Sequence, residues 1–362
     1  MMRRTLLVFV AAACVVFGRV ARTDTPKTLD VYSIDVEGGG ATLFVSPSGQ
    51  SLLVDAGNPG ARDADRIAAA VKAAGLSQID YLVVSHFHSD HVGGVADLSA
   101  RVPIRAFVDH GPAVHDASPF RLADQAFQTY LGARAKGRPI EVKPGDSVPI
   151  KGLDVKVVSS DGALITRPLA GSAAPNPLCG QFVPQEEDLS ENARSVGVVV
   201  GYGRFRVLDL GDLTWNKEHD LVCPKNLLGP IDIYITTHHG LNLSGPAALV
   251  HAIRPRVALM NNGPRKGGSR EAWTTVRTSP GLDDLWQLHY AVQRPGNAAF
   301  HESGDSGGKE LNVPEPFIAN LDENASHTPV HFLKVSARQD GSFAVTNPRT
   351  GFVKEYRARV LR

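Results

Sequence analysis

The stretch DYLVVSHFHSDHVGG, residues 80–94, decides the fold class of this 362-residue chain. Its first five residues form a short, mainly apolar run, which predicts a buried strand. A polar cluster follows the run directly, at residues 85–91. Proteins that alternate strands and helices place their sites at the carboxyl ends of strands. We therefore expect a functional loop immediately after this strand.

The polar cluster consists of residue types that bind metals. Its candidate ligands are His86, His88, Asp90 and His91. Because the spacing H-x-H-x-D-H sends neighbouring side chains in different directions, one loop can serve two cations. Neutral imidazole and carboxylate suit zinc at about 2.0 to 2.2 Å, and a catalytic site keeps one position open for water. The cluster therefore predicts a metal site.

The rest of the chain predicts two halves built from short strands and helices. Strands are expected at residues 29–36, 41–45, 51–54, 80–84 and 104–108, and again at 153–158, 196–200, 205–208, 231–235 and 257–260. Helices are expected at residues 61–74, 246–253 and 282–292, and long loops at 162–194 and 261–278. This alternation predicts helices that cover stacked sheets. Both halves deliver ligand-type side chains from strand ends.

The N-terminus has the layout of a secretory signal. Arg3 and Arg4 precede an apolar run at residues 5–16, and polar residues follow. We expect a signal peptide over residues 1–21, with its cleavage site left open. The apolar run is shorter than the ~20 residues of a membrane-spanning helix. The mature chain is therefore expected to lack an integral membrane segment and to be secreted or periplasmic, with lipoprotein anchoring at Cys14 the less favoured alternative.

Cysteine usage and charge limit the partners. Only Cys179 and Cys223 remain in the expected mature chain, and an oxidising compartment makes them a candidate disulfide. Two separate buried thiols are the alternative. The formal net charge is +1, so no global basic field points to nucleic acid. A local basic patch would still be compatible with nucleic acid, and the oligomeric state is left open.

The loop of residues 86–91, followed by Val92-Gly93-Gly94, resembles the metal loop of the metallo-β-lactamase superfamily. The resemblance covers most of residues 29–345 and implies a hydrolase domain over residues 29–350. It also implies an α/β fold, an αβ/βα sandwich of two mixed sheets with helices on the outer faces. Asp55, after a predicted strand, matches the superfamily's first motif and is implied to brace the metal loop. A turn-forming aspartate is its alternative role.

The remaining ligands are implied by the same resemblance. Asp212 matches the aspartate that bridges two metal ions. His238 and His239 supply the final ligand, and the sequence does not separate them: one is expected to bind metal, and the other to face the substrate as a proton donor or phosphate contact. The resemblance thus implies two zinc ions per chain.

One expected ligand is missing, because most members carry a further histidine upstream of the bridging aspartate. Residues 191–195 of this chain read Glu-Asn-Ala-Arg-Ser. This segment resembles the N-x-x-S version found in the hydrolase domain of ComEC DNA-uptake proteins and in phosphorylcholine esterases. Asn192 could then supply a carbonyl oxygen, or Glu191 a carboxylate, and a plain turn is the alternative. The stretch Asp35-Val36-Glu37-Gly38-Gly39-Gly40 is similar to the opening motif of that branch, with two residues changed.

The resemblance implies an exported, zinc-dependent hydrolase that attacks its substrate with a metal-bound hydroxide. Asp90 is expected to orient the hydroxide, and His238 or His239 to stabilise the leaving oxygen. A phosphoester or phosphodiester is the leading substrate class, because of the ComEC-like and esterase-like features. The alternatives are a lactonase or β-lactamase-like amide hydrolase, and a metal-containing binding protein without turnover.

Other chemically capable residues lack a decisive pattern. The remaining histidines are expected to be surface or core residues, and His110, after a predicted strand, is the first of them to inspect. Arg265, Lys266 and Arg270 lie in a glycine-rich loop that either grips an anionic oxygen or is simply solvated.

Overall fold

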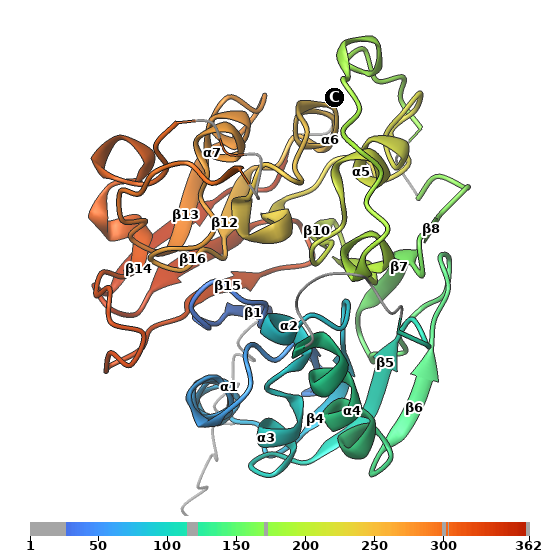
Figure 1. The fold of residues 1–362 in the computed structure, drawn as a ribbon, viewed down its shortest axis with the longest axis vertical. Helices are drawn as coiled ribbons and strands as arrows, with labels where there is room; N and C mark the ends of the chain where they lie inside the picture. The colour runs from blue at the N-terminus through green and yellow to red at the C-terminus, as the bar shows by residue number, and fades with distance from the viewer. Residues whose placement is uncertain (1–26, 114–121, 170–172, 299–301, 303, 360–362) are drawn as a thin grey trace, which may run out of the picture.

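The computed structural model describes residues 27–113, 122–169, 173–298, 302 and 304–359 (Figure 1). The expected signal peptide lies outside the described residues, as do His115 and His301. Two mixed β-sheets pack face to face, and helices cover the outer face of each sheet (Figure 1). This arrangement confirms the α/β sandwich that the sequence predicts.

The first sheet has nine strands in the order β17-β16-β15-β1-β2-β3-β4-β5-β6. Their bounds are β1 Leu29–Ser33, β2 Thr42–Val45, β3 Ser51–Val54, β4 Ile79–Val83, β5 Ile104–Asp109, β6 Arg138–Glu141, β15 Leu333–Ala337, β16 Phe343–Asn347 and β17 Phe352–Tyr356. Neighbours from β3 to β6 are parallel, and the others are antiparallel. The sheet therefore includes residues beyond the expected domain limit at 350.

The second sheet has eight strands in the order β14-β13-β12-β11-β10-β9-β7-β8. Their bounds are β7 Asp154–Ser160, β8 Ala163–Leu164, β9 Gly197–Tyr202, β10 Phe205–Asp209, β11 Ile233–Ile235, β12 Val257–Met260, β13 Asp284–His289 and β14 Ile318–Asn320. Strands β10 to β14 are parallel to one another. Their carboxyl ends therefore lie along one edge, where ligand-type residues can meet.

The helices are short and separate into two groups. Those on the first sheet are α1 Ala61–Ala73, α2 Ser89–Val92, α3 Val95–Ser99 and α4 Leu122–Arg134; those on the second are α5 Trp215–Asp220, α6 Ala247–Ile253 and α7 Arg270–Arg277 (Figure 1). Five 3-10 turns are described at Cys179–Gln181, Glu191–Arg194, Thr237–Gly240, Lys309–Leu311 and Glu315–Phe317. None of the described helices is long and apolar enough to cross a membrane.

Three buried apolar layers hold the sandwich together. The central layer lies between the sheets and includes Phe44, Phe205, Trp286 and Phe343, all at most 1% exposed. The outer layers pack helices against each sheet. The indole of Trp286 donates a hydrogen bond to the hydroxyl of Tyr356 at 3.0 Å. The terminal strand β17 is thus anchored to the opposite sheet through a satisfied polar pair.

Two local predictions are wrong. Residues 284–289, expected to be helical, form strand β13, which is buried along almost its whole length. A strand covered on both faces shows no clear period, so its apolar run resembles a buried helix segment. The expected loop at 261–278 contains helix α7, which begins after Ser269. Strands β15, β16 and β17 were not predicted, because their alternating burial is clear only in the sheet.

The predicted disulfide between Cys179 and Cys223 is confirmed, and it joins residues 44 positions apart. It ties the long segment before the Glu191–Arg194 turn to the chain just after α5. A cross-link of this span restricts the unfolded chain, so replacing both cysteines by alanine should lower the free energy of unfolding by about 2 to 4 kcal/mol. Urea denaturation of both proteins measures the difference. A reductant should destabilise the wild type and leave the variant unchanged; the opposite pattern would contradict the structural bond.

Candidate metal centre

Three strand ends of the sandwich supply the candidate metal ligands, and a fourth supplies Asp55, which supports them. Strand β4 leads into the loop of His86–His91, and Asp55 follows β3; in the second sheet β10 leads to Asp212 and β11 to the Thr237–Gly240 turn. The amide of His238 donates to the carbonyl of Gly211 at 3.0 Å, which links the last two segments. His238 and His239 both have left-handed backbone conformations, with φ of 54° and 58°. The two neighbouring rings lie edge-on, with planes 76° apart, and each brings its Nε2 atom to 3.4 Å from an oxygen of Asp212.

One compact donor set contains Asp90, His91, Asp212 and His239. Their ligand atoms all lie within 4.8 Å of one another. The Nε2 atom of His91 lies 3.2 Å from Nε2 of His239, 3.3 Å from Asp90 Oδ2 and 3.2 Å from Asp212 Oδ2. A tetrahedral zinc ion with ligands at about 2.0 to 2.1 Å places its donor atoms roughly 3.3 Å apart. The set therefore has the dimensions of a zinc site.

A second donor set shares Asp212. The Oδ2 atom of Asp212 lies 3.9 Å from His86 Nε2 and 3.4 Å from His238 Nε2. The ring of His88 packs edge-on against that of His86, with centroids 4.7 Å apart. Among the described residues, His86 Nε2 and Asp212 Oδ1 are buried and have no hydrogen-bond partner. Two orphaned polar atoms at a converging donor set fit a cation, because burying such atoms unpaired is costly.

Hydrogen bonds at the opposite ring nitrogen point the Nε2 atoms of three histidines into the centre. His91 Nδ1 donates to Asp55 Oδ2 at 2.7 Å. His86 Nδ1 lies 3.0 Å from Ser85 Oγ, and this hydroxyl already donates its hydrogen bond to Asp55. It can therefore only accept one from His86. His238 Nδ1 lies 3.4 Å from Ser244 Oγ, and this hydroxyl donates its hydrogen bond to the carbonyl oxygen of Leu213. Each Nδ1 therefore carries the proton and leaves an Nε2 lone pair for a metal.

Asp55 supports the metal loop through hydrogen bonds to His91 and Ser85. Besides His91, it accepts hydrogen bonds from the backbone amide and the hydroxyl of Ser85, both at 2.7 Å. Its own backbone is left-handed, with φ of 61°. Gly40 lies directly above it, since a Cβ atom there would be 2.8 Å from both Asp55 Oδ2 and His91 Nδ1. The carboxylate thus contacts a candidate ligand and the loop backbone.

Charge state also suits metal binding. Although burial opposes ionisation, the positive charges of Lys266 and His91 hold the pKa of Asp90 well below its usual range. In the same way His238, His239 and His91 lower the pKa of Asp212 against the effect of burial. Burial lowers the pKa of His238 to about 4, so its imidazole is neutral at physiological pH. Ionised carboxylates and neutral imidazoles are the forms that bind metals. Although burial opposes the charge, Asp212, Asp90 and Asp55 raise the pKa of His91 well above its usual range, so a metal at this imidazole would displace a proton.

Glu191 and Asn192, in the segment where most members carry the further histidine, differ in their contacts. Glu191 Oε2 accepts hydrogen bonds from the Phe87 amide at 3.2 Å and from His110 Nε2 at 3.0 Å. This oxygen therefore holds the metal loop by its backbone, and His110 belongs to that support. The Oδ1 atom of Asn192 is buried without a hydrogen-bond partner in the described part of the chain. No contact places it on the converging donor sets.

Of the basic loop, only Lys266 reaches the centre. Its ammonium contacts Asp90 Oδ2, and its side chain remains 34% exposed. Arg265 is 62% exposed and pairs with Glu323 at 2.6 Å, and Arg270 contacts the carbonyl of Asp305. The loop also wraps His239, because the Gly268 amide donates to the His239 carbonyl at 3.1 Å. The three cations lie close together in the sequence, and only the tertiary structure shows that one of them contacts the donor set.

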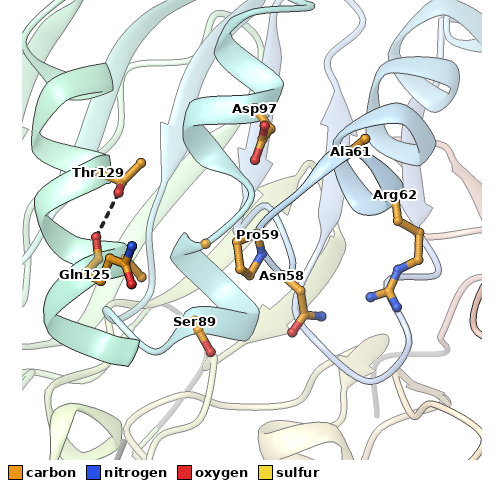
Figure 2. Close-up of a pocket in the computed structure, with 10 residues that line it drawn as sticks. Asn58, Pro59, Ala61, Arg62, Ser89, Asp97, Gln125 and Thr129 are labelled. Atoms are coloured by element: carbon orange, nitrogen blue, oxygen red, sulfur yellow. Dashed lines mark hydrogen bonds between the residues drawn. The ribbon is translucent and has the colours of Figure 1, made fainter. Parts of the chain in front are cut away.

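A cavity of about 560 Å³ lies beside helix α2 (Figure 2). It is lined by Asn58, Pro59, Ala61, Arg62, Ser89, Gly93, Asp97, Gln125, Ala126 and Thr129. Figure 2 shows it between the turn before α1 and helix α4. The cavity touches α2 through Ser89 and Gly93, and none of the candidate metal ligands lines it. It is therefore separate from the converging donor sets.

Comparison with known proteins agrees with this arrangement. Residues 35–174 match the family model of the metallo-β-lactamase superfamily. This match supports a metal-dependent hydrolase, as the sequence predicts. A hydroxyacylglutathione hydrolase of Acidiphilium cryptum is 35% identical over 83 residues, 23% of this chain and 28% of that protein. A β-lactamase-like protein 2 homolog of Caenorhabditis elegans is 31% identical over 64 residues, 18% of this chain and 22% of that protein. The chain thus spans about a quarter of the length of these curated relatives.

Solved structures of metallo-hydrolases are also similar. Igni18, a metallo hydrolase from the hyperthermophilic archaeon Ignicoccus hospitalis, has a TM-score of 0.42 at 14% identity, over 72% of this chain and 95% of that one. Tm1679, a metal-dependent hydrolase of the β-lactamase superfamily, has a TM-score of 0.41 at 14% identity, with the same coverage of both chains.

The brace on His91 can be tested by Asp55→Asn. Asparagine keeps the shape and tolerates the left-handed backbone, but its amide cannot orient the imidazole as the carboxylate does. We expect zinc affinity to fall by about 10- to 100-fold. Competition with a chromogenic chelator measures it. As a matched control, Asp80→Asn alters another buried carboxylate, which accepts the Ser51 amide at 3.0 Å, and should leave zinc affinity unchanged. Equal losses in both variants would contradict a specific brace.

The turn of residues 237–240 rests near a buried acid that should make stability depend on pH. Burial raises the pKa of Glu218 to about 8, and its carboxyl group accepts the Gly245 amide. An unfolded glutamate titrates near 4.3. The unfolded chain therefore loses this proton first, so the acid's contribution to stability falls as pH rises from about 4.3 to 8.

Glu218→Gln removes that titration. The variant should gain stability relative to the wild type between pH 5 and pH 8, as measured by urea denaturation at both values. Glu310→Gln, at an exposed position, is the control and should show no such gain. A parallel pH dependence in wild type and Glu218→Gln would refute the raised pKa.

Proposed function

We propose that this chain is an exported, zinc-dependent hydrolase that cleaves a phosphoester or phosphodiester. The observation that carries the proposal is the convergence of Asp90, His91, Asp212 and His239 within 4.8 Å, next to a second set of imidazoles around the same aspartate. Separate strand ends of both sheets supply these donors. The family match over residues 35–174 supports the hydrolase assignment.

The donors divide into two zinc positions that share Asp212. Asp90, His91 and His239 would hold one ion with it, because their mutual distances of 3.2 to 3.4 Å suit tetrahedral coordination. His86, His88 and His238 would hold the other. In this assignment His238 takes the place of the absent histidine, and Asn192 is the alternative source of that ligand. His239 is then the ligand that follows β11 in the first set.

The chemistry follows from this arrangement. Bound zinc supplies Lewis acidity, which makes water nucleophilic near neutral pH and polarises the substrate oxygen. The ionised Asp90 presents oxygen atoms toward the same space and orients the attacking water by accepting its hydrogen bond. His86, His91 and His239 are each at most 1% exposed, so a bound cation would interact with them in surroundings of low dielectric constant.

Lys266 favours an anionic substrate. Its ammonium lies at the rim of the centre, partly exposed and aimed at Asp90. Once a metal shares the charge of Asp90, the lysine becomes available to donate a hydrogen bond to a non-bridging phosphate oxygen. The similarity of residues 191–195 to the ComEC and phosphorylcholine esterase branch supports the same class.

Export is supported by two features. The first is the charged and then apolar N-terminal pattern of residues 3–16. The second is the Cys179–Cys223 disulfide, since such bonds persist mainly in oxidising compartments.

A substrate panel tests the activity. Zinc-loaded protein is assayed on bis(p-nitrophenyl) phosphate, phosphorylcholine esters, acyl lactones and a β-lactam. Asp212→Ala and His88→Ala should lose nearly all turnover, because no neighbour replaces a lost ligand. Lys266→Met should lower kcat/KM on phosphoesters about 10- to 100-fold, the value of one charge-assisted hydrogen bond. Arg265→Met, the matched control from the same loop, should stay within about twofold of wild type.

Two outcomes would redirect the proposal. Turnover of lactones or β-lactams far above that of every phosphoester would refute the substrate class and leave the metal centre standing. A lack of turnover on the whole panel, in protein shown to contain zinc, would favour a metal-containing binding protein.

A further inference from the structure

A second cluster of ligand-type side chains lies outside the centre described above. It contains Asp35 and Glu37, which follow β1, together with His289 at the end of β13 and His327 in the segment before β15. One donor atom from each lies within 4.8 Å of the others. The side chains of Asp35, Glu37, His289 and His327 are 0%, 7%, 0% and 4% exposed. Four buried donors from both sheets thus meet at one point.

The distances within this cluster match those of a four-coordinate metal site. His289 Nε2 lies 2.9 Å from Asp35 Oδ2 and 3.6 Å from Glu37 Oε1. His327 Nε2 lies 3.2 Å from Asp35 Oδ2 and 3.3 Å from Glu37 Oε1. A tetrahedral zinc ion places its donors roughly 3.3 Å apart. The four nitrogen-to-oxygen separations lie on both sides of this donor-to-donor distance.

The orientation of His327 is a second, independent observation. Its Nδ1 atom lies 3.3 Å from the carbonyl oxygen of Pro329, which can only accept a hydrogen bond. Nδ1 therefore carries a proton, and a neutral ring has its lone pair on Nε2, facing two carboxylates. Such an arrangement is repulsive unless a proton or a metal ion lies between. Histidine ligands of metals are held in this way, with the distal N–H on a carbonyl.

An unpaired, buried carboxylate oxygen of Glu37 is a further observation in favour of a cation here. The side chain of Glu37 is more than nine-tenths buried, and its Oε2 atom has no hydrogen-bond partner among the described residues. Arg66 donates to Glu37 Oε1 at 2.8 Å and lies 3.3 Å from Asp35 Oδ2. One guanidinium offsets only one of the two carboxylates. The remaining negative charge is balanced either by protons on the imidazoles or by a metal ion in their place.

We propose that Asp35, Glu37, His289 and His327 bind a third transition-metal ion, zinc, in a closed structural site. All four positions of a tetrahedral ion would be filled by protein, so no position is left for substrate or water. In metal-free protein, protons on the two imidazoles take the place of the ion. Zinc would displace those protons, and its binding is therefore expected to weaken at acid pH.

The ion would fasten three segments that are far apart in the sequence. It would tie the end of β13 and the segment around His327 to the turn of Glu37-Gly38-Gly39-Gly40. That turn lies on the metal loop, because the Gly40 amide donates to the Asp90 carbonyl at 3.0 Å. The closed site would thus hold a turn that contacts the proposed catalytic centre without taking part in the reaction.

Zinc content tests the proposal directly. Untagged full-length protein is loaded with zinc, dialysed and analysed by elemental mass spectrometry. Wild type should contain about three ions and His327→Gln about two, because one four-ligand site is lost. His251→Gln is the matched control: the Nε2 atom of His251 in α6 faces the carbonyl of Thr275 in α7 at 3.0 Å, and the variant should contain about three ions. Equal zinc content in wild type and His327→Gln would overturn the third site.

A second measurement separates this site from the proposed catalytic centre and does not depend on a variant folding. An anomalous difference map from zinc-loaded wild-type crystals should show a peak between His289 and His327, and a map without that peak would overturn the proposal. Asp212→Ala combined with His239→Ala should lose zinc at the catalytic centre and retain the ion on His327. If the proposed catalytic function is wrong and this inference is right, the ion between His289 and His327 is still found.

Discussion

The structure around the site depends on one buried carboxylate, that of Asp212, lying among four imidazoles. His86, His91, His238 and His239 all direct Nε2 atoms to within 3.9 Å of its oxygens. Neutral imidazole lone pairs and a carboxylate cannot satisfy one another, so the cluster is stable only with protons or metal ions between them. The two sheets must therefore meet at the edge where β4, β10 and β11 end. The apolar layer between the sheets supplies the rigidity that holds this charged cluster together.

Backbone conformation carries much of the positioning. Asp55, His238 and His239 are all left-handed, a conformation that costs free energy for residues other than glycine and persists at functional sites. Glycines allow the close contacts between these segments. A Cβ at Gly211 would lie 2.6 Å from Ser85 Cβ, so only glycine lets the β10 end approach the metal loop. The local strain and the close packing thus serve the same centre.

The turn that begins at Glu37 connects the two clusters of metal-type ligands. Glu37 is itself left-handed, with φ of 59°. A Cβ at Gly38 would lie 3.0 Å from Lys266 Cβ, and one at Gly39 would lie 2.3 Å from the Asp90 carbonyl oxygen. Lys266, which contacts Asp90, and the loop that carries Asp90 therefore both pack against this turn.

The sequence by itself predicted the fold class, which the structure confirms, and a candidate metal loop whose side chains the structure brings together with Asp212 and His239. The H-x-H-x-D-H spacing places those side chains on one loop whatever surrounds it, and the predicted strands at 51–54 and 257–260 coincide with β3 and β12. Tertiary structure alone decided what depends on contacts between distant segments. It separated His239 from His238, because only His239 has its Nε2 near His91 and Asp90, and it separated Lys266 from Arg265 through the path of one loop. It also joined His289 and His327 to Asp35 across more than 250 residues, because no local pattern records which strand ends meet at a sheet edge.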